Sequence, residues 1–363
     1  MRAAAQRLTR DGVTDQPRPP ATILRQVVGL QAQVLSAAAL GMRVRSTGLH
    51  ASAVSEALND DRSIVRSWLM RGTLHVVASD DIRWLIQLLG PVFVRAFATR
   101  HAQLGLNEDL RTGGVAAIRR ILSESGPLTR YELVDRLRAR NIGLNPKTQA
   151  PIHLIGLAAL QSVLCVGPDR GDGESRYVLL DDWIPRAAAM PSRELALAEL
   201  ARRYFTAYGP ATIEDFKAWS GIPMAEARSA VARAKASLTE VTIQRQPGFV
   251  LKDRLKRVTT SPTAQVRLLP TFDTYLLGYR RRDLAVPPAL QRRLQRGGGW
   301  LHPAVVVNGH AVAAWSLRKS GSRGVVNVEP CASITRPVRA GIEAEVADIG
   351  RFLDLPLRLE IAR

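Results

Sequence analysis

The sequence predicts an α+β protein made of three tandem winged-helix modules and a small C-terminal antiparallel β-barrel-like domain. Three observations predict this class: an order of helices that recurs along the chain, two Gly-Pro turns at equivalent places in that order, and a change to short β-rich runs after about residue 260. A chain of 363 residues is long for a single core, so several modules are expected.

The second module, residues 111–187, is the clearest. The turn GPLT ends at Thr129, a suitable N-cap whose capping-box partner is Glu132. Three helices followed by a hairpin are typical of a winged helix, in which the third helix rests on the duplex and the hairpin is the wing. The predicted elements are helices over 115–123, 130–140 and 152–161 and strands in VLCVGP and RYVLL.

The same order recurs in residues 188–260, where GPAT at 209–212 repeats the turn. Helices are predicted there over 195–204, 213–219 and 225–236, with strands in LTEVTIQ and FVL around a turn at 246–248. Residues 1–110 form a divergent first module, with helices over 22–40, 51–58 and 62–70 and a strand in TLHVVA. Residues 261–363 contain β-rich runs (VRLLP, YLLGY, WLHPAVVVNG, AVAAWSL, GVVNVEP), a helix over 337–353 and a last strand, LRLEI.

The charge of the chain points to nucleic acid. Lys and Arg number 51 against 32 Asp and Glu, a formal net charge of +19, and such a surplus attracts polyanions. A solvated, arginine-rich surface is the alternative interpretation. Cys165 and Cys331 are far apart and lack the spacing of metal ligands, so we expect no disulfide scaffold and no metal. Without a Walker loop or a dinucleotide fingerprint, we expect no cofactor. The chain lacks a signal-like or membrane-spanning apolar stretch, so we expect a cytoplasmic location and no membrane contact. We also expect a monomer, with double-stranded DNA as its partner.

The Gln31-Ala32-Gln33 segment lies within the predicted first helix. On a helical period Gln31 interrupts the apolar stripe of Leu24, Val28 and Leu35, and a buried amide is costly unless it is hydrogen-bonded. Taken alone, this pattern favours a structural interpretation, with Gln31 bonded to a neighbouring loop and Gln33 on the surface. Residues two apart on a helix also point in nearly opposite directions, which makes a shared site difficult.

The sequence resembles the winged-helix DNA glycosylase family of the AlkZ type over almost its whole length. That family is characterised by a Gln-apolar-Gln or Gln-apolar-Asp motif, and Gln31, Ala32 and Gln33 match the first version. The resemblance implies three winged helices and a small β-barrel around a DNA-sized channel, with Gln31 and Gln33 catalytic. The matching segments are LRQVVGLQAQ at 24–33, RSWLMRGTLHVV at 66–77, LLPTFDTYLLGYRRR at 268–282 and HPAVVVNGHAVAAW at 302–315.

The implied activity is that of a monofunctional DNA glycosylase acting on purines alkylated at N7 or N3, in DNA repair or antibiotic self-resistance. Bulky adducts and interstrand crosslinks are compatible with it. A base alkylated at these positions is cationic and leaves as a neutral molecule, so two amides that orient water and face the developing sugar cation suffice. The alternatives are a non-catalytic winged-helix DNA-binding protein, such as a transcriptional regulator, and a protein-interaction scaffold. Release of modified base separates the first hypothesis from both.

Each group of secondary candidates also has a structural interpretation: a hydrogen-bonded core histidine, an aspartate that caps a turn, and a solvated basic face. The auxiliary site candidates are Arg71, Thr73, His75 and Asp273. The DNA-binding candidates are Tyr279, Arg280, Arg281, Arg282, Arg292 and Arg293, with Arg296 beside them.

Overall fold

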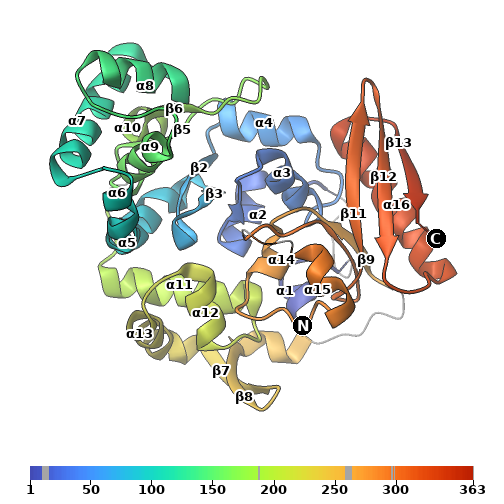
Figure 1. Ribbon diagram of the computed structural model, residues 1–363. Coiled ribbons are helices and arrows are strands. Elements are labelled where there is room, and N and C mark those ends of the chain that lie inside the picture. The colour runs from blue at the N-terminus through green and yellow to red at the C-terminus, as the bar shows by residue number, and fades with distance from the viewer. Residues whose placement is uncertain (10–15, 187–188, 258–263, 296, 298, 363) are drawn as a thin grey trace. The chain divides into compact units, whose positions relative to one another are not determined.

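The protein is represented by a computed structural model that describes residues 1–9, 16–186, 189–257, 264–295, 297 and 299–362. It mixes helices and sheets (Figure 1), which confirms the α+β class. The chain forms two compact units, one of residues 1–54 and 198–363 and the other of residues 55–197. The helices α4 (Ala51–Asn59) and α11 (Arg193–Tyr208) each contain one of the two boundaries.

The 55–197 unit contains the element order predicted for the second module. The capping box at the start of α8 is present, because Glu132 N donates to Thr129 Oγ1 at 3.3 Å and Thr129 N donates to Glu132 Oε2 at 2.8 Å. The helices are α5 (Ser79–Ala96), α6 (Ala98–Gln103), α7 (Glu108–Ser125), α8 (Arg130–Ala139), α9 (Ala150–Leu160) and α10 (Leu180–Trp183). The remaining elements are β2 (Ile64–Trp68), a 3-10 turn (Met70–Gly72), β3 (Leu74–Ala78), β4 (Leu128–Thr129), β5 (Leu164–Val166) and β6 (Arg176–Leu179).

The strands of this unit follow the order β3-β2-β5-β6-β4 in a sheet whose neighbouring strands are antiparallel. The helix predicted over 62–70 is wrong, because this segment forms β2, which is buried at all five positions. The apolar residues Ile64, Val65, Trp68 and Leu69 fit a helical period as well as a fully buried strand, and spacing alone does not separate the two.

Helix α9 departs from the expected character of a DNA-contacting helix. Nine of its eleven residues are buried, and the other two, Ile152 and His153, are half-buried. It packs against α5, α7 and α8. A helix that is apolar all round is a core helix, so α9 presents no row of side chains to a duplex, contrary to the expectation for the third helix of a winged helix.

The other unit contains the order predicted for the third module, and Thr212 and Asp215 form a capping box at the start of α12. The hairpin turn is at Gln244 and Arg245, both with positive φ, and not at 246–248 as predicted. The elements are α12 (Ile213–Ser220), α13 (Met224–Ala234), a 3-10 turn (Lys235–Ser237), β7 (Leu238–Ile243), β8 (Gln246–Leu251) and a second 3-10 segment (Lys252–Arg257).

The C-terminal part forms an open sheet with the strand order β13-β12-β11-β10-β9. Within the described residues no pairing joins β13 to β9, so the expected barrel closure is not found. The β12 and β13 strands are parallel because α16 connects them and packs against β9 and β13. The YLLGY run, expected as β-rich, lies mostly in a helix, α14. The elements are β9 (Val266–Leu269), α14 (Thr274–Leu277), α15 (Pro288–Leu294), β10 (Ala304–Val307), β11 (His310–Ser320), β12 (Arg323–Pro330), α16 (Arg336–Leu353) and β13 (Leu357–Ile361).

At its N-terminal end this unit contains α1 (Arg2–Ala5), α2 (Pro20–Val27), β1 (Leu30–Gln31) and α3 (Leu35–Arg43). No helix in the described part of the chain has the length and apolar character needed to cross a membrane.

Candidate active site

The single helix predicted over 22–40 is wrong, and the error concerns the candidate glutamines. Helix α2 ends at Val27, and Val28 and Gly29 have φ of 56° and 95°. The Gly29 amide donates to the Leu24 carbonyl oxygen at 2.9 Å, which closes the helix. Glycine adopts a positive φ at no steric cost, so the chain leaves the helix here. It forms the short strand β1 at Leu30 and Gln31 and bends at Gln33 and Val34 before α3 begins at Leu35.

Burial alternates along this segment. Leu30 and Ala32 are 2% and 0% exposed, whereas Gln31 is half-buried and Gln33 is exposed. Side chains in an extended chain alternate between two sides with a period of two. The burial pattern therefore leaves Gln31 and Gln33 more accessible to solvent than Leu30 and Ala32, which lie in the core. Because the two glutamines do not lie on a helix, the expectation that residues two apart point in nearly opposite directions does not apply to them.

The segment before Gln31 is held by a buried tyrosine of α11. Tyr208 Oη donates to the Val27 carbonyl oxygen at 2.7 Å and lies 2.6 Å from Thr274 Oγ1. Burial raises the pKa of Tyr208 to about 12, so the hydroxyl keeps the proton that it donates. Tyr208 could not be predicted from the sequence, because nothing in its local pattern distinguishes it from a core aromatic residue.

The chain just beyond the end of α3 is fixed by a buried ion pair. Arg45 donates through two nitrogens to the two carboxylate oxygens of Asp273, each at 2.8 Å, and both side chains are buried. Asp273 Oδ1 also accepts from Tyr275 N at 2.8 Å and caps α14. The carboxylate considered as an auxiliary site group thus caps a helix and pairs with Arg45, a residue that the sequence analysis missed.

The other auxiliary candidates belong to the 55–197 unit and lie together around a tight turn. Arg71 has a φ of 55°, and a Cβ at Gly72 would lie 2.4 Å from Phe97, so this turn requires a glycine. His75 on β3 is buried, and its Nδ1 is 2.9 Å from the Thr73 carbonyl oxygen. Because a carbonyl only accepts, Nδ1 carries the proton and Nε2 is left as an acceptor. Burial and then the Arg71 charge lower the pKa of His75 to about 3.

The lowered pKa of His75 predicts that the free energy of unfolding decreases in acid. Its pKa is about 6.5 in an unfolded chain and about 3 in the folded protein. The unfolded chain therefore binds one more proton between these values, and this group lowers the free energy of unfolding by about 1.4 kcal/mol for each pH unit of acidification. His75→Asn keeps a donor near the Nδ1 position and removes the titration. Denaturant unfolding from pH 7 to 4 should show a shallower loss for this variant, and parallel curves for both proteins would contradict the assignment.

The DNA-binding candidates divide into buried and exposed groups. Tyr279 is 5% exposed, its hydroxyl donates to the Tyr208 carbonyl oxygen at 2.9 Å, and the Arg2 guanidinium covers its ring at 3.8 Å. Arg282 is half-buried and donates through Nε to the Leu276 carbonyl oxygen at 2.8 Å. Neither side chain is placed for a phosphate contact. The exposed candidates are Arg280, Arg281, Arg292 and Arg293, and Arg296 lies outside the described residues.

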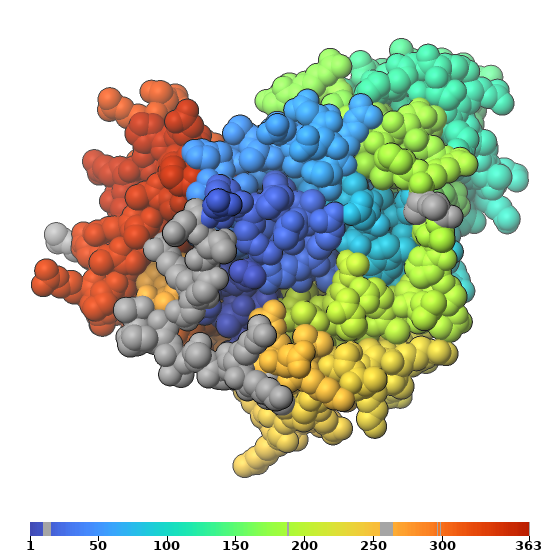
Figure 2. Space-filling view, turned by 180° about the vertical axis from the view of Figure 1, so that it is seen from behind, coloured from blue at the N-terminus to red at the C-terminus, as the bar shows by residue number. Residues whose placement is uncertain are grey.

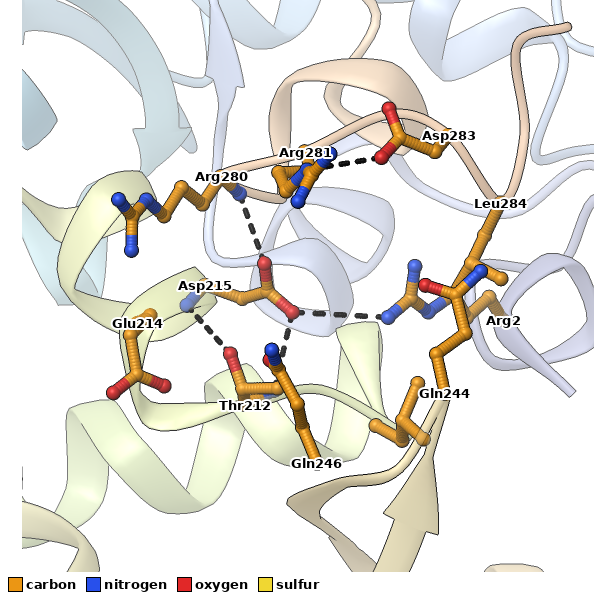
Figure 3. A pocket seen from close by; sticks show the side chains of 11 residues that line it. Arg2, Thr212, Glu214, Asp215, Gln244, Gln246, Arg280, Arg281, Asp283 and Leu284 are labelled. Atoms are coloured by element: carbon orange, nitrogen blue, oxygen red, sulfur yellow. Dashed lines mark hydrogen bonds and ion pairs between the residues drawn. The ribbon is translucent and has the colours of Figure 1, made fainter.

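Arg280 and Arg281 line a hollow of about 170 Å³ beside the β7–β8 turn (Figure 3). At its centre Asp215 accepts from Arg280 N at 2.9 Å and from Thr212 N at 3.1 Å, and lies 3.7 Å from an Arg2 nitrogen. Asp215 thereby joins three chain segments. The Arg280 side chain points away from Asp215 in Figure 3. Because carboxylates and guanidinium groups both line the hollow, it is not a simple anion site.

Comparisons with known proteins agree with one another. The family described as DNA glycosylase AlkZ-like matches residues 24–352. An interstrand DNA cross-link repair glycosylase of Streptomyces sahachiroi is 29% identical over 375 residues, covering 98% of this chain and 97% of the relative. The solved structure of Streptomyces sahachiroi DNA glycosylase AlkZ is similar with a TM-score of 0.82 and 26% identity, over 99% of this chain and 97% of that one.

Proposed function

Because the chain belongs to the AlkZ-like DNA glycosylase family, we propose that it hydrolyses the N-glycosidic bond of purines alkylated at N7 or N3 in duplex DNA, with Gln31 and Gln33 as its catalytic residues. The observation that supports this proposal is the alternation of burial over Leu30–Gln33, in which both glutamines are more accessible than Leu30 and Ala32. Alkylation at N7 or N3 makes the base cationic, so the base leaves as a neutral molecule and needs no acid to protonate it.

The remaining chemical task is to place a water molecule and to stabilise the sugar cation. Two side-chain carbonyl oxygens can accept from a water molecule and direct their negative dipole ends to the sugar carbon. A buried contact from Tyr208 holds the chain just before the segment, and the Arg45–Asp273 pair fixes the chain beyond the far end of α3. Such fixed dipoles need little reorganisation when charge develops, which is the physical basis of their contribution.

The exposure of Gln33 supports a broad range of lesions. Enzymes that enclose a flipped base in a tight pocket read its edge and exclude large adducts, whereas an amide at the surface sets no such limit. The relative from Streptomyces sahachiroi is named for interstrand cross-link repair, and we extend that substrate to this chain as part of the proposal. The protein then acts in DNA repair or in self-resistance to a DNA-alkylating agent.

We further propose that the three helix-and-hairpin modules bind the duplex through phosphates. The net charge of +19 and the exposed guanidinium groups of Arg280, Arg281, Arg292 and Arg293 support such contacts. This binding is expected to be independent of base sequence and to weaken with salt.

The proposal is tested by base release from duplexes that carry one lesion each. We expect release of 7-methylguanine, whose base is cationic, and none of O6-methylguanine, which has the same added methyl group on a neutral base. Unmodified duplex should also give no release, and an N7-linked interstrand crosslink should be unhooked. Mass spectrometry of the released base and denaturing gels measure these outcomes. Equal release of both methylguanines would contradict a mechanism that depends on a cationic leaving group, and no release of 7-methylguanine would exclude the activity.

A further inference from the structure

The third helices of the two repeated modules differ in what they expose. Helix α9 is buried almost all round and contains no charged side chain. Helix α13 has one buried face, formed by Ala227, Ala230, Val231 and Ala234, and packs against α12. Its opposite face is exposed, so the two equivalent helices cannot serve the same purpose.

The exposed face of α13 combines small residues with arginines. Positions 225, 228, 229, 232 and 233 follow the spacing of one helix face, and all five are exposed. Ala225, Ser229 and Ala232 are small, so another molecule can approach the helix closely there. Arg228 and Arg233 flank them, and neither guanidinium forms an ion pair with a residue that the structure describes.

Other exposed cationic side chains lie near α13 in the same module. Lys235 is exposed just after α13, and the half-buried Glu226 lies only at the edge of the face. The β7–β8 hairpin, yellow in Figures 1 and 2, projects from the surface and carries the exposed Arg245 in its turn. Its neighbour Gln244 lines the hollow to which Arg280 and Arg281 also belong (Figure 3). A surface with these charges is complementary to a polyanion.

We propose that α13 is a duplex-contacting helix of this protein. Its small residues face a DNA groove, Arg228 and Arg233 contact phosphates on either side, and α9 has a purely structural role. The inference rests on the proposed function only in taking duplex DNA as the ligand. Because phosphate contacts position a protein without reading bases, the contact by α13 is independent of sequence and of damage.

The test measures binding to an unmodified duplex, where no excision occurs. For Arg228→Ala/Arg233→Ala we expect the slope of log K against log salt to decrease by up to about 1.8, from about 0.9 for each lost phosphate contact. The matched control is Arg336→Ala/Arg339→Ala, which removes two exposed arginines from one face of α16. Fluorescence anisotropy at several salt concentrations gives both slopes. Equal slopes for the α13 and α16 variants would overturn the proposal.

A second pair of variants tests the close approach. Ala232→Glu places a carboxylate on the proposed contact face, and repulsion from phosphates should weaken binding by at least about tenfold. Ala340→Glu makes the same change at an exposed position of α16 and should leave binding within a few-fold. Circular dichroism checks that each variant is folded. Unchanged binding by folded Ala232→Glu would exclude α13 from the interface.

The two proposals fail separately. If the α13 variants bind normally while base release depends on Gln33, the glycosylase proposal stands and the α13 contact is wrong. If the α13 variants lose binding but the wild-type protein releases no modified base, the contact stands and the proposed activity is wrong.

Discussion

Gln33→Ala should lose excision of 7-methylguanine by at least about 10²–10³-fold while its affinity for duplex DNA stays within a few-fold. The rate falls because one of two fixed dipoles that orient water and face the sugar cation is removed. Affinity is retained because it comes mainly from phosphate contacts elsewhere. Gln33 is exposed, so its truncation leaves no buried cavity and the fold should be intact. Single-turnover excision and anisotropy binding measure the two effects.

Two variants sharpen this experiment. Gln33→Asp keeps a carbonyl-type acceptor and should retain part of the activity, since a carboxylate also orients water and faces a cation. Gln295→Ala, which truncates an exposed glutamine at the end of α15, should excise like the wild type. Wild-type excision by Gln33→Ala would remove Gln33 from the mechanism, and a parallel loss of binding and excision would make it a DNA-binding residue instead.

Glu345→Ala should destabilise the protein by about 3–5 kcal/mol, because it breaks a buried ionic network. Glu345 Oε2 accepts from Arg43 Nη2 and from Leu268 N, each at 3.0 Å, and Oε1 lies 3.4 Å from Arg267 Nη1. Removal of the carboxylate leaves Arg43 with Asp348, at 2.8 Å, as its remaining ion-pair partner. Unfolding in denaturant measures the loss.

Glu343→Ala is the matched control on the same helix. Glu343 pairs with Arg339 at 3.0 Å, but both side chains are more than half exposed, and exposed pairs contribute about 0–1 kcal/mol. A cost for Glu345→Ala as small as that of Glu343→Ala would contradict a stabilising role for the buried network. Because Glu345 does not belong to the proposed site, the folded fraction of Glu345→Ala should excise at the wild-type rate.

Many of the helices in residues 111–260 could be predicted from the sequence because their signals are local. The capping boxes at Thr129 and Thr212 and the periodic helices after them depend on residues a few positions apart. Two errors arose where tertiary burial outweighs such patterns. The 62–70 segment is a strand because both of its faces are buried, and the chain breaks at Val28 and Gly29 although the apolar spacing continues through them. A single Gly within a helical pattern signals such a break only weakly.

The sequence predicts Gln31 and Gln33 as site residues, and their catalytic role stays a prediction. Their predicted backbone conformation was wrong, because the chain leaves the helix at Val28 and Gly29 before it reaches them. Tyr208 and Arg45 are distant in the sequence from the residues they fix, Val27 and Asp273. Contacts between residues so far apart in the sequence produce no periodic pattern from which they could be predicted. The open C-terminal sheet was mistaken for a barrel because alternating strands and tight turns occur in both.

Because burial alternates over Leu30–Gln33, the number of residues between the two glutamines determines whether both side chains are accessible. An inserted residue between the two glutamines would turn one amide toward the interior, where Ala32 now leaves no exposed surface. Insertion of two residues would restore the common direction, but it would increase the distance between the two glutamine positions by about 7 Å. The amides would then be too far apart to share one water molecule. Under the proposed mechanism, the middle residue can therefore be replaced by another that fits its buried position, but the number of residues between the two glutamines cannot change.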